Sequence, residues 1–290
     1  MEKYVDLHMH TTNSDGQFNP EQLLVLAKNN NVGTISITDH DDIRSVNDIK
    51  KINKKYDINF VNGVELSSIT EIKGRKQWLH ILGYGMDENN PELNRIMQKK
   101  REIRYNVNHQ YLIDLLNNFN FINEDILIRI PCDRFIKLSR LIDKYITEKK
   151  LSIDQLETIR KYLNTIKPIY EGYEFADKEA IELILKSGGY PVLAHPYQYK
   201  LSYKEEYDLL IKLKNMGLVG LEKFHSGDTK EGMKMQDEFA SMFDLEWTVG
   251  SDFHTDYDDF GNQIGLGKNN NLCKTNCSLL EKIKNKVYKV

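Results

Sequence analysis

Near its start the chain carries Tyr4-Val5-Asp6-Leu7-His8-Met9-His10, a strand-like segment that ends on two histidines. Six more strand-like segments end on, or within one or two residues of, a His, Asp or Glu. These ends are Thr38-Asp39-His40, Gly63-Val64-Glu65, His80, Ala194-His195-Pro196, Glu222 with His225, and Gly250-Ser251-Asp252-Phe253-His254. Side chains at the carboxyl ends of successive parallel strands converge on one face of a barrel, where such folds place their chemistry. The recurrence therefore predicts an enzyme with several metal ions.

The composition sets broad limits on the class of protein. The 290 residues are enough for one large α/β domain, or one domain with an insertion. The net charge of −3 gives no overall attraction to nucleic acid or membrane. The three cysteines, Cys132, Cys273 and Cys277, lack the partners of a zinc ribbon, and we expect reduced thiols. With neither a signal peptide nor a membrane span in the sequence, we expect a cytoplasmic protein.

Short apolar runs alternate with helical patterns on both sides of a central stretch. This rhythm is typical of β/α units around a parallel sheet. Asn19 before Pro20 predicts a helix start, Asp42 is the expected cap of the next helix, and a last helix is expected over Ser278–Tyr288. The expected strands number seven, one short of the common eight-stranded barrel. They are Tyr4–His10, Thr34–Thr38, Asn59–Glu65, Leu79–Gly83, Tyr190–His195, Val219–Phe224 and Glu246–Gly250.

The central stretch, residues 91–168, has helical patterns only, notably Glu92–Asn118 and about Ile136–Lys149. We interpret it as a helical insertion that caps a barrel formed by residues 1–90 and 169–290. The insertion holds 15 Lys and Arg against 10 Asp and Glu, a balance of +5, which leaves −8 for the barrel. Acidic ligands suit cations and a basic cap suits an anionic substrate, although the charged helical faces could instead be simply solvated.

The candidate ligands differ in how strongly each one by itself indicates metal binding. His8 and His10 point to the same face of a strand, where the alternative is a pair of buried, hydrogen-bonded histidines. Asp15, in Ser14-Asp15-Gly16, lies in a turn that is ordinarily structural. Glu65 is the best candidate for a bridging ligand, because a carboxylate offers one oxygen to each of two metals. Apart from His225, six of the eight histidines lie at expected strand ends, a distribution that packing alone does not readily produce.

Taken together, these segments resemble the signature motifs of the PHP (polymerase and histidinol phosphatase) family of metal-dependent phosphoesterases. The resemblance spans the whole barrel portion, in order. It is closest to the branch with Asp in the Ser-Asp-Gly loop, an inserted helical domain, and activity as a nucleotide phosphatase or short-RNA 5′-to-3′ exonuclease. The motifs are His8-x-His10, Ser14-Asp15-Gly16, Thr38-Asp39-His40-Asp41, Gly63-Val64-Glu65, His80, Ala194-His195-Pro196 and Gly250-Ser251-Asp252-Phe253-His254.

The resemblance implies a distorted seven-stranded (β/α)7 TIM-like barrel and three divalent metal ions. Imidazole and carboxylate ligands suit Zn²⁺, Mn²⁺ or Fe²⁺. We expect metals bridged by Glu65 to lower the pKa of a shared water, which attacks phosphorus as hydroxide. The implied ligand sets are His8, His10, Glu65 and Asp252 for the first metal, Glu65, His80 and His195 for the second, and Asp15, His40 and His254 for the third.

Five further residues are candidates for catalysis or substrate binding. Asp39 is expected to orient a ligand imidazole, with a helix cap as the alternative. His225 is expected to donate to the phosphate or protonate the leaving group, with a surface histidine as the alternative. Arg134 and Arg140 resemble the arginines of the family's cap segment and suit a second phosphate, with surface salt bridges as the alternative. The family's histidine after the first arginine is missing here, where Lys137 could supply charge instead.

The expected activity is hydrolysis of phosphate esters on nucleotides, such as 3′,5′-bisphosphates, or at the 5′ end of short RNA. A small-metabolite phosphatase of the histidinol-phosphate type is one alternative, against which Asp15 argues. A non-catalytic metal-bound module is another, against which the full ligand set argues. An amidohydrolase would commonly use a carbamylated lysine as bridge, and no lysine lies near Glu65. We expect neither a membrane association nor an obligate protein partner.

Overall fold

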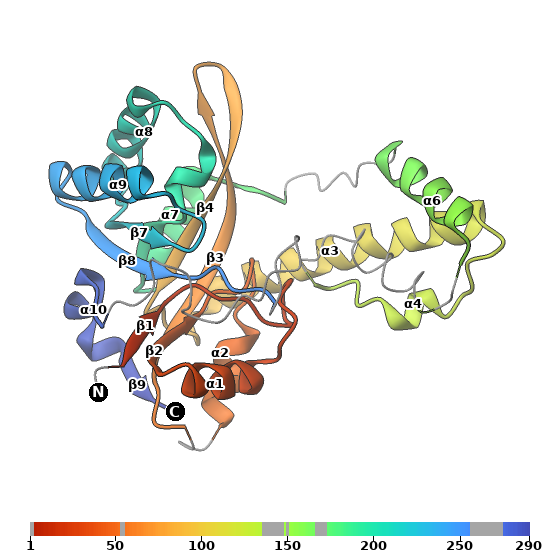
Figure 1. Ribbon diagram of the computed structural model, residues 1–290, viewed down its shortest axis with the longest axis horizontal. Helices are drawn as coiled ribbons and strands as arrows, with labels where there is room; N and C mark the ends of the chain where they lie inside the picture. Colours follow the sequence, from red (N-terminus) through yellow and green to blue (C-terminus); the bar gives the residue numbers. More distant parts are fainter. Residues whose placement is uncertain (1–2, 53–55, 135–147, 149–150, 166–172, 256–274) are drawn as a thin grey trace. The chain divides into compact units, whose positions relative to one another are not determined.

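The computed structural model describes residues 3–52, 56–134, 148, 151–165, 173–255 and 275–290. The chain divides into two compact units (Figure 1). The first unit comprises Met1–Met97 and Glu174–Val290, and the second comprises Gln98–Tyr173.

The first unit is a mixed α/β fold built on a large sheet. Within the described residues the sheet has nine strands, and seven of them follow the order β1-β2-β3-β4-β6-β7-β8, with β5 and β9 both paired to β3. Most neighbours along this order run parallel, which places the carboxyl ends of several strands on one side. The strands are β1 (Tyr4–Asp6), β2 (Val32–Ile37), β3 (Asn59–Ile72), β4 (Arg75–Tyr84), β5 (Phe175–Ala176), β6 (Tyr190–Leu193), β7 (Gly220–His225), β8 (Glu246–Gly250) and β9 (Val287–Lys289).

Helices of the first unit pack against these strands, α1 on β2, α7 on β3 and β4, and α9 on β7. Asn19 caps α1 in a capping box with Gln22, and Pro20 is the first helical residue, which confirms the predicted start. The expected cap of α2 is wrong: Ile43 occupies the N-cap position and its side chain makes no capping hydrogen bond, although Asp42 just before it accepts a hydrogen bond from the backbone of Arg44. The helices are α1 (Pro20–Asn29), α2 (Arg44–Lys51), α7 (Asp177–Lys186), α8 (Tyr203–Asn215), α9 (Lys230–Met242) and α10 (Ser278–Lys282), with short 3₁₀ turns η1 (Pro196–Tyr199) and η2 (Lys284–Lys286).

The β3–β4 pair departs from the expected β/α alternation. A tight turn at Lys73-Gly74 joins two long strands, and β4 runs antiparallel to both β3 and β6. The expectation of a parallel strand with His80 near its carboxyl end is therefore wrong. Gly74, at φ 76°, provides the left-handed backbone that the turn requires. Figure 1 shows the β3–β4 hairpin extending beyond the neighbouring strands. In agreement with this, β6 pairs only with the last residues of β4.

Backbone hydrogen bonds also connect the ends of β1 and β8, the first and last strands of the seven-strand order. The amide of Leu7 donates to the carbonyl of Val249 at 2.9 Å, and Met9 forms a parallel bridge with Phe253. The carboxylate of Asp6, which is fully buried, accepts from both the amide and the hydroxyl of Ser251. These contacts hold the His8 and Asp252 segments beside each other.

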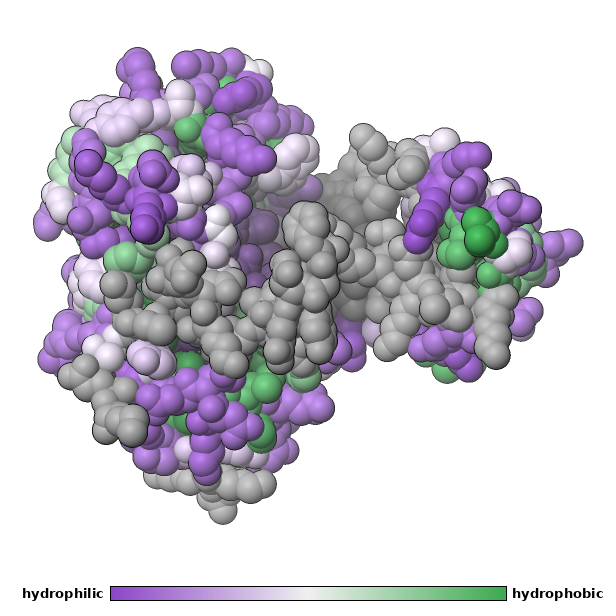
Figure 2. All heavy atoms as spheres, in the orientation of Figure 1, coloured by the Kyte–Doolittle hydropathy of each residue, from purple (hydrophilic) through white to green (hydrophobic). Residues whose placement is uncertain are grey.

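The predicted last helix is only partly right. Helix α10 ends at Lys282, and the residues after η2 form strand β9, which pairs antiparallel with Asn59–Val61 of β3. Helical periodicity continues to Tyr288 in the sequence, but the edge of β3 offers unpaired backbone groups that a strand can satisfy. The outward side of the first unit is polar, and Figure 2 shows mostly hydrophilic residues over α8 and α9.

The second unit is helical, with α3 (Pro91–Asn118), α4 (Ile126–Arg129) and α6 (Ile153–Thr165). Helix α3 begins where the insertion was expected to begin, but its first turns belong to the first unit, because Leu93 and Met97 pack into that unit's core. The second unit has its own apolar core, which includes Leu112, Leu115, Ile126 and Ile159. Apart from Glu148, the helix expected at Ile136–Lys149 lies outside the described residues, as do Lys137 and Arg140. None of the described helices is long and apolar enough to span a membrane.

Candidate metal centre

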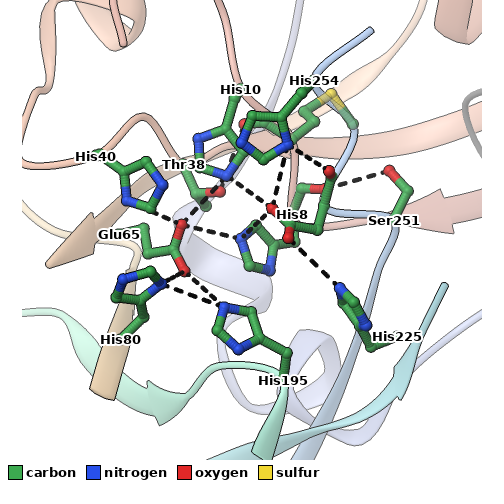
Figure 3. A network of polar contacts seen from close by, with 12 residues as sticks. His8, His10, Thr38, His40, Glu65, His80, His195, His225, Ser251 and His254 are labelled. Carbon is green, nitrogen blue, oxygen red and sulfur yellow. Dashed lines mark hydrogen bonds and ion pairs between the residues drawn. The ribbon is translucent and has the colours of Figure 1, made fainter. Parts of the chain in front are cut away.

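The nine candidate ligands come from six separate segments of the first unit and meet in one cluster. Figure 3 shows Glu65 and the ligand histidines of this cluster. His8 and His10 follow β1, Asp15 lies in the next loop, and His40 follows β2. Glu65 and His80 lie within the β3–β4 hairpin, where His80 reaches the cluster from the antiparallel strand. His195 follows β6, and Asp252 and His254 follow β8.

Glu65 lies at the centre of the cluster and is fully buried. Its Oε2 lies 3.2 Å from Nε2 of His8 and 3.2 Å from Nε2 of His10. Its Oε1 lies 2.9 Å from Nδ1 of His80 and 3.1 Å from Nε2 of His195. Nδ1 of His40 also lies 3.3 Å from Oε2, so the two oxygens face different sets of imidazoles. This is the arrangement that a carboxylate bridging two metal ions requires.

Three ligand groups can be distinguished. Ligand atoms of His8, His10, Glu65 and Asp252 all lie within 4.8 Å of one another, as do those of His10, Asp15, His40 and His254. The first group has the same members as the first implied set, and the second adds His10 to the third implied set. For the remaining set, Nδ1 of His80 and Nε2 of His195 lie 3.3 Å apart beside Glu65. His40 also groups with Glu65 and His80.

Buried polar atoms test whether this cluster fits metal ions. Within the described residues, Nε2 of His8, Nε2 of His10 and Oε2 of Glu65 are buried without a hydrogen-bond partner. Such atoms are costly to bury unless another interaction satisfies them. All three point to the same place, and imidazole nitrogen and carboxylate oxygen are the ligands of Zn²⁺, Mn²⁺ and Fe²⁺. The residues therefore fit divalent ions of this kind.

The charges of the cluster also favour cations. Burial opposes ionisation of Glu65 and Asp252, but the surrounding imidazoles outweigh it and hold both pKa values well below the usual range. Burial disfavours the charged form of His10 as well, yet the adjacent carboxylates of Asp252 and Glu65 raise its pKa to about 10. Burial lowers the pKa of His40 to about 3 despite the attraction of Glu65 and Asp15. Without bound metal, protonated imidazoles balance the negative charge of the carboxylates. A divalent ion can take over this role from the protons.

Two of the candidate ligands have strained backbone. His195 has φ 28° and Asp252 has φ 55°, both in the left-handed region that residues other than glycine rarely adopt. Each such conformation costs about 1–3 kcal/mol and persists only where the surroundings impose it. The strained conformations turn the chain sharply at the ends of β6 and β8, and both side chains face the cluster. Figure 3 shows this for His195.

Glu222 is the supporting residue that the sequence did not single out beyond its place at a strand end. It is fully buried on β7, and its Oε1 lies 3.0 Å from Nδ1 of His8. Its Oε2 accepts a hydrogen bond of 2.8 Å from the amide of His195. Because a carboxylate only accepts, Nδ1 of His8 carries a proton, and in the neutral ring Nε2 is left to present its lone pair to the cluster. A glutamate inside the apolar segment Gly220–Phe224 was the available signal.

Asp39 holds the loop after β1 and, among the described residues, forms no hydrogen bond with an imidazole. It is fully buried and accepts from the amide of Thr11 at 2.7 Å and from the hydroxyl of Ser14 at 2.6 Å. The hydroxyl of Ser14 in turn lies 3.4 Å from Nδ1 of His10. Any influence of Asp39 on a ligand therefore passes through Ser14.

His225, the last residue of β7, lies at the edge of the cluster and is buried. Its Nδ1 accepts a hydrogen bond of 3.1 Å from the amide of Gly227, which places the proton of the neutral ring on Nε2. This Nε2 lies 3.5 Å from Oδ2 of Asp252, as Figure 3 shows. His225 can thus present a proton donor beside the candidate ligands.

Arg134 is the one predicted substrate contact within the described residues, and it belongs to the second unit. The side chain of Asn108 on α3 donates to the carbonyls of Cys132 and Arg134, at 2.8 and 3.5 Å. Arg104 donates to the carbonyl of Asp133 at 3.2 Å. Helix α3 therefore holds the backbone that carries Arg134.

Comparison with known protein families shows which family has this set of residues. The model of the PHP domain matches residues 6–243, which include most of the first unit and seven of the nine candidate ligands, with Glu222 and His225 beside them. The chain belongs to the PHP domain family. This PHP chain is 30% identical over 283 residues to a 5′-3′ exoribonuclease of Haemophilus influenzae, which covers 97% of this chain and 100% of the relative.

Two further comparisons concern Chromobacterium violaceum. The PHP chain is 27% identical to its 3′,5′-nucleoside bisphosphate phosphatase, over 86% of this chain and 87% of the relative. A solved structure from the same organism, described as an amidohydrolase, superposes with a TM-score of 0.73 and 23% identity. It covers 99% of this chain and 98% of that structure, and at this identity the likeness concerns the fold alone. The predicted recognition and enzyme class, a hydrolase of phosphate esters, are confirmed by the family and the relatives.

Proposed function

We propose that this PHP enzyme hydrolyses phosphate esters of nucleotides, either of 3′,5′-bisphosphates or at the 5′ end of short RNA, where cleavage releases a mononucleotide. The observation that carries the proposal is the central Glu65, whose two oxygens face separate sets of imidazoles. The relatives named as an exoribonuclease and as a nucleoside bisphosphate phosphatase support this class of substrate. A cytoplasmic location stays a prediction.

Three divalent ions, of Mn, Zn or Fe, are proposed to occupy the cluster. His8, His10, Glu65 and Asp252 would hold the first, Glu65, His80 and His195 the second, and Asp15, His40 and His254 the third. Bound ions of this kind activate water as a nucleophile and neutralise charge on the phosphate. The three ligand groupings around Glu65 and Asp15 support this number.

The protein's own groups divide the remaining tasks. Glu222 fixes the ring of His8 so that Nε2 faces the substrate side. The strained turns at His195 and Asp252 hold their side chains in place before substrate arrives. His225 is proposed to donate the proton on Nε2 to the leaving oxygen or to the phosphate. Asp39 is proposed to position His10 through Ser14.

The proposal extends to the fold and the second unit. We infer that the seven-strand order and the backbone hydrogen bonds between the ends of β1 and β8 belong to a distorted seven-stranded barrel. The insertion, predicted at 91–168, is proposed to act as the substrate cap. Arg134, on a segment held by Asn108 and Arg104, is proposed to bind a second phosphate of the substrate.

The test is release of phosphate and mononucleotide from adenosine 3′,5′-bisphosphate and from a 5′-phosphorylated RNA pentamer, with Mn²⁺. We expect Asp252→Asn to reduce turnover of both by at least about a thousandfold, because it removes a charged ligand. We expect Arg134→Ala to raise KM by about tenfold, since it removes one bidentate contact. The matched controls, Asp208→Asn and Arg129→Ala, change exposed residues of the same types and should retain activity.

Two outcomes would contradict the proposal. Cleavage of histidinol phosphate without cleavage of either nucleotide would indicate the small-metabolite phosphatase. Absence of turnover with all three substrates, despite bound metal, would indicate a non-catalytic module.

A further inference from the structure

Trp78 is an exposed aromatic side chain on the β3–β4 hairpin. It leaves 59% of its surface exposed, whereas tryptophan is on average among the more buried residues. The other tryptophan, Trp247, is partly buried and packs against Phe224. An apolar ring of this size in solvent is more costly than the average surface residue. Its position on the hairpin therefore calls for a functional explanation.

The register of the hairpin places Trp78 on the same face as the metal cluster. Trp78 precedes His80 by two residues on β4, and alternate residues of a strand point to the same side. Trp78 is opposite Ile69 on β3, and His80 is opposite Ser67. Glu65 lies two residues before Ser67, so this face leads from the central carboxylate outward to Trp78.

The opposite face of the hairpin confirms the assignment of sides. Leu66 on β3 and Leu79 and Ile81 on β4 are fully buried in the core of the first unit. Residues between them in sequence therefore point away from that core. The side chains of Glu65 and His80 point into the cluster. The side chain of Trp78 points to the same side, beyond the residues of β4 that pair with β6.

The spacing suits a nucleotide. Two residues along a strand span about 7 Å, so the ring of Trp78 begins one such step outward from His80. If a phosphate is held at the cluster, the nucleoside attached to it begins at a similar distance, and it can extend toward Trp78. Beyond Trp78 on the same face is Lys76, an exposed cation. Aromatic rings alternating with positive charge are the features that bind single-stranded nucleic acid.

We propose that Trp78 is a stacking platform for the nucleobase of the substrate. The inference rests on the proposed function, since it assumes that the phosphate at the cluster belongs to a nucleotide. Stacking requires only the flat face of a base, and so the platform would accept all four bases. Trp78 would thus set a preference for nucleotides over small phosphorylated metabolites without taking part in the chemistry.

The main experiment compares adenosine 3′,5′-bisphosphate with the same ribose bisphosphate lacking the base, with Mn²⁺. We expect Trp78→Ala to raise KM for the nucleotide by about tenfold, with kcat changed little, and to leave KM for the abasic compound unchanged. Trp78→Phe keeps a stacking ring and should stay within about threefold of wild type. Gln77→Ala, which changes the next residue on the other face, is the matched control and should resemble wild type.

A binding experiment separates failure of this inference from failure of the proposed function. In a Trp247→Phe variant, Trp78 is the only tryptophan, and its fluorescence is followed during titration with adenosine 5′-monophosphate or ribose 5-phosphate in the presence of Zn²⁺. We expect quenching by the nucleotide only. Quenching without turnover of nucleotides would overturn the proposed function and leave the platform standing. Nucleotide turnover whose KM is unaffected by Trp78→Ala, or equally affected for the abasic compound, would overturn the platform.

Discussion

At the scale of single residues, the candidate metal centre depends on the ligands and also on the residues that orient the ligand side chains. Glu222 contacts both His8 and the backbone of His195, and it is buried where no solvent can replace it. A carboxylate behind a ligand imidazole fixes the ring and raises the basicity of the nitrogen that faces the metal. Glu222 therefore influences two of the proposed ligand sets at once.

We expect Glu222→Gln to lower the affinity of the enzyme for Mn²⁺ by about 10–100-fold, because the neutral amide is a weaker acceptor for Nδ1 of His8. Metal retained after dialysis against increasing chelator concentrations measures the change. The thermal stability of the metal-free protein, followed by circular dichroism, tests whether the variant is folded. Glu71→Gln, at an exposed position of β3, is the control. Equal metal retention by both variants would exclude the role assigned to Glu222.

At the scale of secondary-structure elements, helices α8 and α9 share a buried polar pair. Gln236 on α9 donates to Oε1 of Glu206 on α8 at 2.7 Å, and both side chains are buried. Burial raises the pKa of Glu206 from 4.5 to about 7, against the hydrogen bond from Gln236. The helix pair therefore holds a neutral glutamic acid at mildly acidic pH.

This raised pKa predicts a specific pH dependence of stability. The unfolded chain releases the proton of Glu206 near pH 4.5 and the folded chain only near pH 7. Folding is therefore favoured most below the lower value, and the free energy of unfolding falls by about 3 kcal/mol as the pH rises between the two. We expect Glu206→Gln to remove this fall.

Urea unfolding of metal-free wild type and Glu206→Gln at pH 5 and pH 8 measures the free energy of unfolding of each protein. Subtracting one from the other at each pH cancels the contributions of the other titrating groups. The control is Glu231→Gln, an exposed change on α9, which should follow wild type at both pH values. Parallel pH profiles for wild type and Glu206→Gln would show that Glu206 ionises normally in the folded protein.

At the scale of the whole molecule, the centre joins segments that lie far apart in the chain. Its candidate ligands extend from His8 to His254, and all of them belong to the first unit. Such a site exists only in the folded protein. Ions that bind it therefore stabilise the native state by mass action, by about 2.7 kcal/mol at one hundred times the dissociation constant.

We expect Mn²⁺ or Zn²⁺ to raise the Tm of metal-free enzyme by about 5 °C or more. Differential scanning calorimetry with and without the ion measures the shift. Asp252→Asn should show a clearly smaller shift, and Asp208→Asn should show the full one. An equal shift with Ca²⁺, or in the Asp252→Asn variant, would indicate non-specific binding instead of the proposed sites.

The sequence by itself determined the alternation of elements, the start of α1 and the composition of the cluster. Strand ends are local patterns, and imidazoles and carboxylates at them are visible in one dimension. Tertiary structure alone decided that β4 is antiparallel, that the last residues form β9, and that Glu222 supports His8. Strand direction depends on which edge is available for pairing. The task of a buried carboxylate likewise depends on neighbours that folding brings from distant parts of the chain.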